Sequence, residues 1–239
     1  NASVPSSSGL SLPRENIGEV SNQGFEIQLG YADKINEFNY SINGNIATNR
    51  NKIIFWDETP GVPEYQKSTG KPMNANLYYN AIGIFKDANA LAEYPHWAGS
   101  RPGDIIFEDV NNDGKIDGLD RVRANKTELP TLTAGLNLDL SYKQFYTSIF
   151  FQGAFGAMRN SYYEMQGEVG NYLKQNIDGR WTPENVDAVK PRIWNRYNEY
   201  WRSNQNTYWL EKSNYVRLKN FEFGYTFNEN FSKKFKISR

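Results

Sequence analysis

Apolar and polar residues alternate strictly in a stretch near the start of the chain. One side of an extended backbone there carries Phe25, Ile27, Leu29 and Tyr31. A period of two is typical of a β-strand with two different faces. The same alternation returns over residues 38–46 after a short link, which suits two strands joined by a tight connection. The pattern therefore predicts a hairpin over residues 24–46.

The alternation recurs twice further along the chain. Residues 132–142 and 145–151 alternate on either side of a short turn, which predicts a second hairpin over 132–155. A fifth strand is predicted over 215–227. Val216 and Leu218 are out of phase with the aromatic residues that follow them, so we expect a bulge near Lys219 and Asn220.

The connections between these strands differ greatly in length. Tight turns close the two hairpins, whereas the connections 47–131 and 156–214 are far longer than ordinary domain loops. Strands of about 9 to 12 residues with short turns at one end and long loops at the other are typical of an outer-membrane barrel. If the short turns are periplasmic, both long loops are extracellular. The extended stretch 77–85 then belongs to the first of these loops, because another crossing would leave the next strand on the wrong side.

The predicted fold class is all-β, a partial antiparallel transmembrane β-barrel. Aromatic residues cluster at the short-turn ends of the strands, where a membrane interface is expected. Five strands cannot close a barrel, because an open edge in lipid leaves backbone groups without partners. We therefore expect the chain to be an incomplete fragment. A soluble sandwich also alternates, so the periodicity alone leaves the surroundings of the sheet open.

Composition narrows the classes of partner. Twenty-seven basic residues balance 27 acidic ones without a basic cluster, which argues against nucleic acid as a partner. Only 38% of the residues are hydrophobic and the mean hydropathy is −0.74, while aromatic residues make up 15%. The chain has no cysteine. Disulfides and thiolate metal sites are thereby excluded, but hard cations are not.

Residues 109–120 have the spacing of an EF-hand-type calcium loop, with oxygen donors at positions 1, 3, 5, 9 and 12 and glycine at position 6. The predicted ligands are the side chains of Asp109, Asn111, Asp113, Asp117 and Asp120 and the backbone carbonyl of Lys115. Position 12 is Asp rather than the usual Glu, and the preceding residues 103–108 look extended rather than helical. The alternative is an Asp/Asn/Gly-rich turn whose side chains bond their own backbone. A bound calcium ion would brace the 47–131 loop.

All six tryptophans fall in segments that are expected to lie outside the cell: Trp56, Trp97, Trp181, Trp194, Trp201 and Trp209. Large rings on such loops suit packing of the loops themselves, stacking on sugars or docking of a lid. A polar lining that faces the lumen is predicted for Glu26, Gln28, Asn43, Asn45, Asn137 and Asp139.

No pattern in the sequence favours an enzyme. The single histidine, His96, lies beside Trp97, and the sequence contains neither a G-x-S-x-G motif nor a phosphate-binding glycine loop. Adjacent acids such as Asp57 and Glu58 are the residue types of a glycosidase, but turn solvation explains them more simply. We predict no catalytic residues.

Four blocks in this order resemble the C-terminal part of SusC/RagA-type TonB-dependent outer-membrane transporters: residues 103–121, 141–153, 181–185 with 191–192, and 213–225. The resemblance implies a 22-stranded barrel with an N-terminal plug. It also implies import of oligosaccharides or peptides with energy from the TonB complex, beneath a SusD-like surface lipoprotein. The plug and the last strands are not found in this sequence.

Two functions remain in view. The first is TonB-dependent import of a bulky nutrient through the outer membrane, and the alternative is a secreted, calcium-stabilised β-protein that binds glycans. They differ in what the apolar strand faces touch, because only the first needs those faces to contact lipid.

Overall fold

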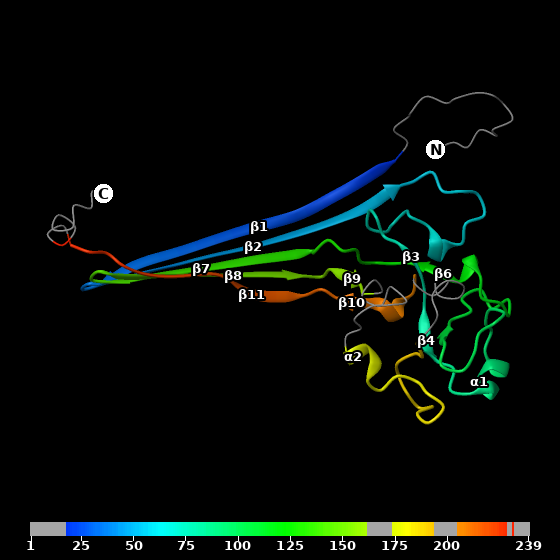
Figure 1. Ribbon diagram of the computed structural model, residues 1–239. Coiled ribbons are helices and arrows are strands. Elements are labelled where there is room, and N and C mark those ends of the chain that lie inside the picture. Colours follow the sequence, from blue (N-terminus) through cyan, green and yellow to red (C-terminus); the bar gives the residue numbers. More distant parts are fainter. Residues whose placement is uncertain (1–17, 162–173, 194–204, 229–230, 232–239) are drawn as a thin grey trace, which may run out of the picture. The chain divides into compact units, whose positions relative to one another are not determined.

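In the computed structural model (Figure 1), residues 18–161, 174–193, 205–228 and 231 are described. Five strands form one sheet in the order β1-β2-β7-β8-β11, and each neighbouring pair with a defined register is antiparallel. The strands are β1 (Glu19–Ile35), β2 (Phe38–Phe55), β7 (Leu132–Tyr142), β8 (Phe145–Phe155) and β11 (Tyr215–Tyr225). The predicted five-stranded arrangement is confirmed.

The bounds of the strands differ in part from those predicted. The first hairpin, predicted over 24–46, runs from 19 to 55, because both strands extend through polar residues that do not follow the alternation. The predicted 47–131 loop therefore gives its first residues to β2. The last strand ends at Tyr225 rather than at residue 227. Two-residue turns close both hairpins, with Asn36 at φ 55° and Lys143 at φ 54°.

The register of the sheet accounts for the phase change in the last strand. Pairing between β11 and β8 shifts between Leu218 and Asn220, which is the predicted bulge. Because of this shift, Leu218 lies opposite Phe151 and Phe221 lies opposite Ile149, both on the apolar face. The bulge thus keeps the apolar residues of β11 on one side of the sheet.

The same register divides the sheet into an apolar and a polar face. Ile42 lies opposite Leu138, which lies opposite Ile149 on the next strand. Large apolar side chains of this face are exposed to an unusual degree, with 74% of Leu29 and 66% of Phe223 accessible. Among the described residues, this face has no protein layer that buries it.

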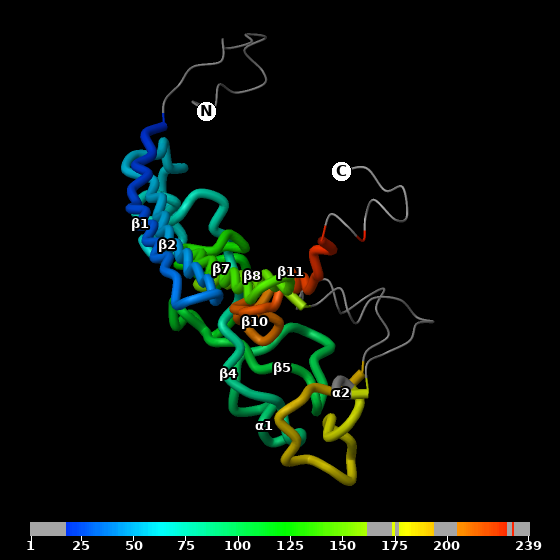
Figure 2. The backbone as a smooth tube through the Cα atoms, turned by 90° about the vertical axis from the view of Figure 1, so that its left-hand side faces the viewer, coloured from blue at the N-terminus to red at the C-terminus, as the bar shows by residue number. Residues whose placement is uncertain are grey.

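The chain divides into two compact units. We call residues 22–50, 129–157 and 213–239 the sheet unit, and residues 1–21, 51–128 and 158–212 the loop unit. Figure 2 traces the backbone of both. The described part of the loop unit contains three two-stranded antiparallel sheets, two short α-helices and three 3-10 helices, η2 (Glu64–Gln66), η3 (Gly118–Asp120) and η6 (Thr207–Trp209). The sheets and α-helices are β3 (Leu77–Tyr79) with β6 (Arg121–Arg123), β4 (Ala81–Ile84) with β5 (Ile105–Phe107), β9 (Met158–Asn160) with β10 (Leu210–Lys212), α1 (Ala88–Glu93) and α2 (Lys174–Ile177).

The extended stretch 77–85 lies outside the five-stranded sheet, as predicted, and contributes β3 and β4 to the loop unit. None of the helices among the described residues has the length and apolar character needed to cross a membrane.

The loop unit has a hydrophobic core of its own. Ile105, Phe107, Ile116 and Trp209 form a buried cluster, and Trp97 is among the half-buried side chains packed against it. Strand β5, which lies within the stretch 103–108 predicted to be extended, places Ile105 and Phe107 in this cluster. The core therefore joins segments from both long connections.

Candidate functional site

The polar face of the sheet carries a hydrogen-bonded network at its centre. Asp139 on β7 accepts hydrogen bonds from Ser148 Oγ on β8 at 2.7 Å and from Ser41 Oγ on β2 at 3.1 Å. Asn137 Nδ2 donates to the same carboxylate at 2.6 Å. Three neighbouring strands thus hold one half-buried carboxylate in a fixed orientation.

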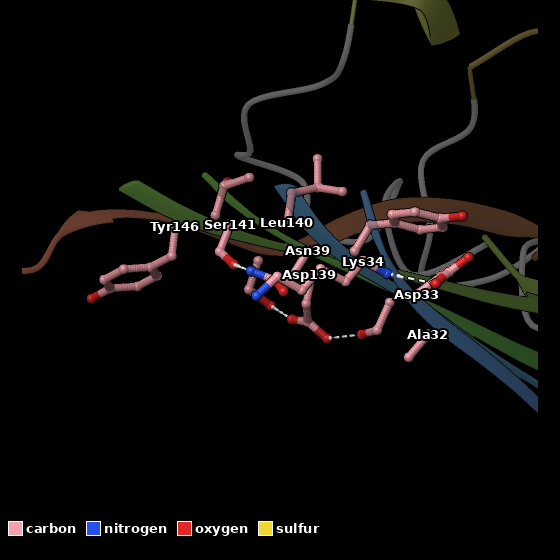
Figure 3. Close-up of a pocket in the computed structure, with 12 residues that line it drawn as sticks. Ala32, Asp33, Lys34, Asn39, Asp139, Leu140, Ser141 and Tyr146 are labelled. Atoms are coloured by element: carbon pink, nitrogen blue, oxygen red, sulfur yellow. Dashed lines mark hydrogen bonds between the residues drawn. The ribbon is translucent and has the colours of Figure 1, made fainter. Parts of the chain in front are cut away.

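A hollow of about 610 Å³ lies over this network (Figure 3). Its polar lining includes Lys34, Asn39, Ser141 and Tyr146, and Asn39 Nδ2 donates to Ser141 Oγ at 3.1 Å. Six of its lining residues carry hydroxyl groups, Asn39 carries an amide, and Asp33, Lys34 and Asp139 are charged. Such a surface is compatible with water and with uncharged polar molecules.

The lining residues predicted from the sequence belong to this polar face. Asn43 lies directly opposite Asn137, and Asn45 lies two residues further along β2. Alternation along β1 puts Glu26 and Gln28 on the side opposite Phe25 and Ile27.

The side chains of residues 109–120 are directed toward the backbone of their own loop. Asp109 accepts hydrogen bonds from the backbone N–H of Asp113 at 3.2 Å and of Gly114 at 2.8 Å. Asn111 accepts from Asp113 N–H at 3.2 Å, and Asp113 accepts from Lys115 N–H at 2.9 Å. Gly114, at φ 78°, permits the sharp turn. These bonds have the form of the Asx turns considered as the alternative.

The end of the loop is fixed by a reciprocal cap. Asp117 accepts from Leu119 N–H at 2.7 Å, while Asp120 accepts from Asp117 N–H at 2.7 Å and from Val110 N–H at 2.9 Å. The Asp120 side chain is only 1% exposed. Its carboxylate therefore ties the first and last parts of the loop together.

A neighbouring turn holds this loop from outside. The Gln66 amide donates to three backbone carbonyls of residues 118–121, and the Tyr65 hydroxyl donates to Leu119 O at 2.8 Å. Burial raises the pKa of the Tyr65 hydroxyl, and the negative charges of Asp120 and the other loop aspartates raise it further. Across the described residues, no group of three or more Asp, Glu, His or Cys side chains is arranged to hold a metal ion.

Three of the predicted tryptophans pack within the loop unit. Trp209 is 5% exposed, and the Trp97 ring meets Tyr79 and Phe107 at 5.1 and 5.2 Å between centroids. Trp181 lies against Gly103, where a Cβ atom would come within 2.5 Å of the indole, and its Nε1 donates to Lys86 O at 3.0 Å. These contacts show that the three rings pack against other residues of the loop unit.

Trp56 differs from these three, because 49% of its side chain is accessible. The remaining two, Trp194 and Trp201, lie outside the described residues.

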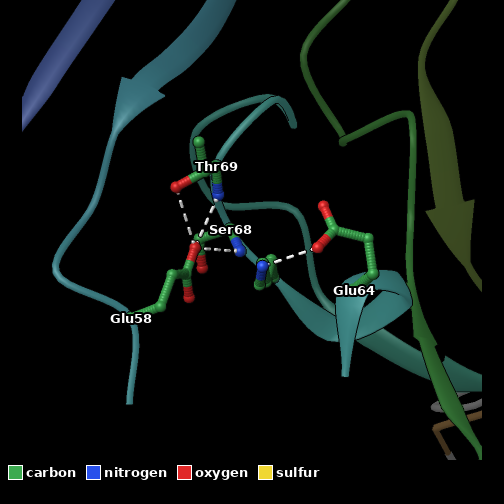
Figure 4. A network of polar contacts seen from close by, with 5 residues as sticks. Glu58, Glu64, Ser68 and Thr69 are labelled. Carbon is green, nitrogen blue, oxygen red and sulfur yellow. Dashed lines mark hydrogen bonds and ion pairs between the residues drawn. The ribbon is translucent and has the colours of Figure 1, made fainter. Parts of the chain in front are cut away.

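Local hydrogen bonds account for two of the other residues weighed as catalytic, Glu58 and His96. Glu58 accepts from the backbone N–H groups of Ser68 and Thr69, both at 2.7 Å, and so closes a turn (Figure 4). His96 is exposed, with its Nδ1 2.9 Å from Tyr94 O. Sequence reasoning missed the contact of Gly103 with Trp181; glycine within the first resemblance block was its only signal.

No family model matches the chain. Three receptors of Formosa agariphila (strain DSM 15362 / KCTC 12365 / LMG 23005 / KMM 3901 / M-2Alg 35-1) are similar to it over almost its whole length. TonB-dependent receptors P3, P26 and P39 are 29%, 26% and 23% identical to it over 97%, 94% and 95% of the chain. The aligned part is 24%, 24% and 26% of each receptor, so the chain spans about a quarter of their length.

Solved structures share the fold. The structure of the RagAB peptide transporter superimposes with a TM-score of 0.65 at 20% sequence identity. The match covers 93% of this chain and 24% of the transporter chain. The RagAB peptide importer in its open-open state superimposes with a TM-score of 0.66 at 18% sequence identity. That match covers 96% of this chain and 25% of the importer chain. That these relatives are receptors and transporters fits the prediction that the chain is not an enzyme. The chain is thus related to part of the TonB-dependent receptors and has the fold of part of a RagA-type β-barrel, as the resemblance read from its sequence predicted.

Proposed function

We propose that the chain forms part of the wall of an outer-membrane barrel that imports a bulky nutrient in a TonB-dependent manner. The observation that carries the proposal is the sheet with one exposed apolar face and one polar face. Exposed apolar side chains on that face include Phe25, Ile27, Leu29, Leu136, Val216, Leu218, Phe221 and Phe223. A continuous apolar surface of this kind is unfavourable in water and favourable against hydrocarbon.

The alternative, a secreted calcium-stabilised protein that binds glycans, requires a protein core on the apolar side. Leu138 and Ile149 would have to be covered by a second layer. They lie on one sheet whose opposite surface is polar, and β1 and β11 end that sheet on either side. This arrangement favours the barrel.

Single cysteines with a polarity-sensitive fluorophore test which face meets lipid. The chain has no cysteine, so no native thiol within this segment competes with the introduced one. In the full-length protein in lipid bilayers, Leu29→Cys and Phe223→Cys should give blue-shifted emission. The adjacent Gln28→Cys and Glu222→Cys serve as matched controls and should report water. Equal emission from both members of each pair would exclude the membrane wall.

The proposed partners follow from the relationship with TonB-dependent receptors and the RagA-type fold. They are the TonB complex, outer-membrane lipid and a SusD-like surface lipoprotein, with an oligosaccharide or peptide as cargo and the loop unit outside the cell. Affinity purification of the tagged full-length protein from outer membranes should recover one lipoprotein in a fixed ratio. Recovery of the barrel alone under mild detergent would argue against that partner.

We also propose that Trp56 is the tryptophan of the described residues that contacts a lid or ligand, since the other three are packed. Trp56→Ala should weaken lipoprotein co-purification or nutrient binding. The buried Trp209 is unsuitable as a control because its removal would damage the core. Exposed Tyr94, 37% accessible, is a better one.

For residues 109–120 we propose a structural calcium ion. The spacing of oxygen ligands and the turn at Gly114 support it, and a cation would offset the mutual repulsion of Asp109, Asp113 and Asp117. Asp120 would be the closing ligand and Lys115 would contribute its carbonyl. Calcium titration by calorimetry should give a saturable signal that is lost in Asp113→Asn/Asp117→Asn. Absence of heat in the unmodified protein would leave the hydrogen-bonded turn as the full explanation.

A further inference from the structure

Three glycines on the polar face lie beside large side chains of the neighbouring strand. A Cβ atom at Gly30 would come within 2.5 Å of Asn43 Oδ1, and one at Gly135 within 2.5 Å of Asn45 Oδ1. At Gly224 it would collide with the ring of Tyr146, its partner across the β11–β8 pair. Each glycine thus makes room for a neighbouring side chain to lie down along the sheet.

None of these three glycines has a positive φ, so a turn does not explain them. Glycine within a strand weakens it and often marks a close approach. The apolar face behaves differently. At Gly44 the atoms nearest to an added Cβ would lie 3.9 Å away, at ordinary contact distance, and Gly153 is crowded chiefly by Phe155 of its own strand.

The polar groups of the same face bond largely to one another. Asp139 accepts from three side chains, as described above. Arg217 donates to Gln152 at 3.2 Å, and Asn220 donates to Glu222 at 2.8 Å. A group that is already hydrogen-bonded gains little by exchanging its partner for a passing ligand.

Small side chains add clearance at the hollow. Ala32, Ser41, Ser141 and Ser148 are among its lining residues, and the ring of Tyr146, which also lines the hollow, lies over Gly224. At the hollow the polar face is therefore low, in the sense that its side chains project little from the sheet. Its polar groups are also hydrogen-bonded to one another.

We propose that the polar face is a low lining past which polar cargo moves without being held, and that Gly30, Gly135 and Gly224 keep it low. The inference rests on the proposed import function. It assigns these glycines a role in the rate of passage rather than in binding of the cargo. The cargo that suits such a lining is polar and largely uncharged, because Asp139, Arg217 and Glu222 of the wall are engaged by neighbouring side chains.

Alanine at Gly30 or Gly135 tests the role directly. In each case the nearest obstructing atom is the tip of a flexible asparagine, so the barrel can fold while the amide is pushed off the wall. In cells with the full-length protein, uptake of two isotope-labelled pools is measured, one of oligosaccharides and one of peptides. We expect Gly30→Ala to slow uptake several-fold with unchanged equilibrium binding of the same pool. Gly44→Ala is the matched control and should import at the normal rate.

Rescue separates obstruction from general damage. Asn43→Ala should restore uptake in the Gly30→Ala protein, because it removes the displaced amide. Normal uptake by Gly30→Ala, or a marked loss of binding in Asn43→Ala alone, would overturn the lining while leaving import intact. If the unmodified protein takes up neither pool, the proposed function itself fails and the inference falls with it.

Discussion

The two units of the chain place their apolar residues in opposite ways. Most buried hydrophobic side chains of the described residues belong to the loop unit: Ile53, Ala75, Phe85, Ile105, Ile106, Phe107, Ile116 and Trp209. Among the described residues of the sheet unit, the buried hydrophobic ones are only Ala154 and Ala157, and many large apolar side chains are exposed. The loop unit therefore has a core suited to water, whereas the sheet unit relies on surroundings that supply the apolar contact. Overall hydrophobic content cannot reveal this difference, because both units contribute to one average.

The largest effect is expected from a cavity in the loop-unit core. Phe85 is 1% exposed, and Phe85→Ala should cost about 3–5 kcal/mol of loop-unit stability. Hydrogen–deuterium exchange should accelerate at amides of the loop unit and stay unchanged in β7 and β8. Val189→Ala, at a side chain that is 80% exposed, is the control. Equal acceleration in both units would mean that they share one core.

A charge on the apolar face should be the next most damaging change. Leu29→Arg is expected to cost about 2–4 kcal/mol if that residue lies near the middle of the bilayer. The same change at Gln28, on the polar face, should cost far less. Urea-induced unfolding of the full-length protein in vesicles measures both. If the two arginines prove equivalent, the distinction between the faces is lost.

The ion pair between Arg192 and Asp104 joins the two long connections within the loop unit. Arg192 Nε donates to Asp104 Oδ1 at 2.6 Å, and the side chains are 16% and 13% exposed. Arg192→Met should cost about 2 kcal/mol, since it leaves a mostly buried carboxylate without its charged donor. Limited proteolysis near residue 193 should become faster. An Arg192→Met/Asp104→Asn protein should recover part of the loss, and no recovery would point to packing of the arginine stem instead.

The smallest effect is expected at the exposed pair of Lys86 and Asp187. The hydrogen bond and the charge of Lys86 lower the pKa of the Asp187 carboxyl from its ordinary value of 3.8. Because the folded pKa is the lower one, the contribution is present above pH 3.8 and disappears as the pH falls through the folded pKa. Lys86→Ala should return the Asp187 pKa toward 3.8 in an NMR titration, with little change in stability at neutral pH. A carboxyl that titrates identically in both proteins would show that the pair does not form.

The sheet unit could be predicted because a single rule governs it. Alternation, turn length and the phase change at Leu218 are local properties, and they predict the two hairpins, the fifth strand and its bulge. The predicted bounds 24–46 are too narrow for the first hairpin. Polar residues such as those around Asn49 belong to the strand without following the apolar–polar alternation.

The loop unit was far less predictable, because its contacts join residues distant in sequence. Trp181 and Lys86 are 95 residues apart, and no local pattern marks their meeting at Gly103. The aspartates of residues 109–120 show the same limit. Their spacing was evident, but whether the carboxylates turn toward an ion or toward their own backbone depends on charge and solvation rather than spacing.

The hydrogen bonds between the two long connections also bear on the order in which the protein folds. Residues 81 and 207, 86 and 181, and 104 and 192 are hydrogen-bonded partners separated by 126, 95 and 88 positions. Contacts of such sequence separation form late, because a long loop must be closed before any of them is made. The hairpins of the sheet, by contrast, close locally. During assembly the loop unit should therefore complete its core after β7 and β8 have paired, and pulse-labelled hydrogen exchange would show protection appearing in that order.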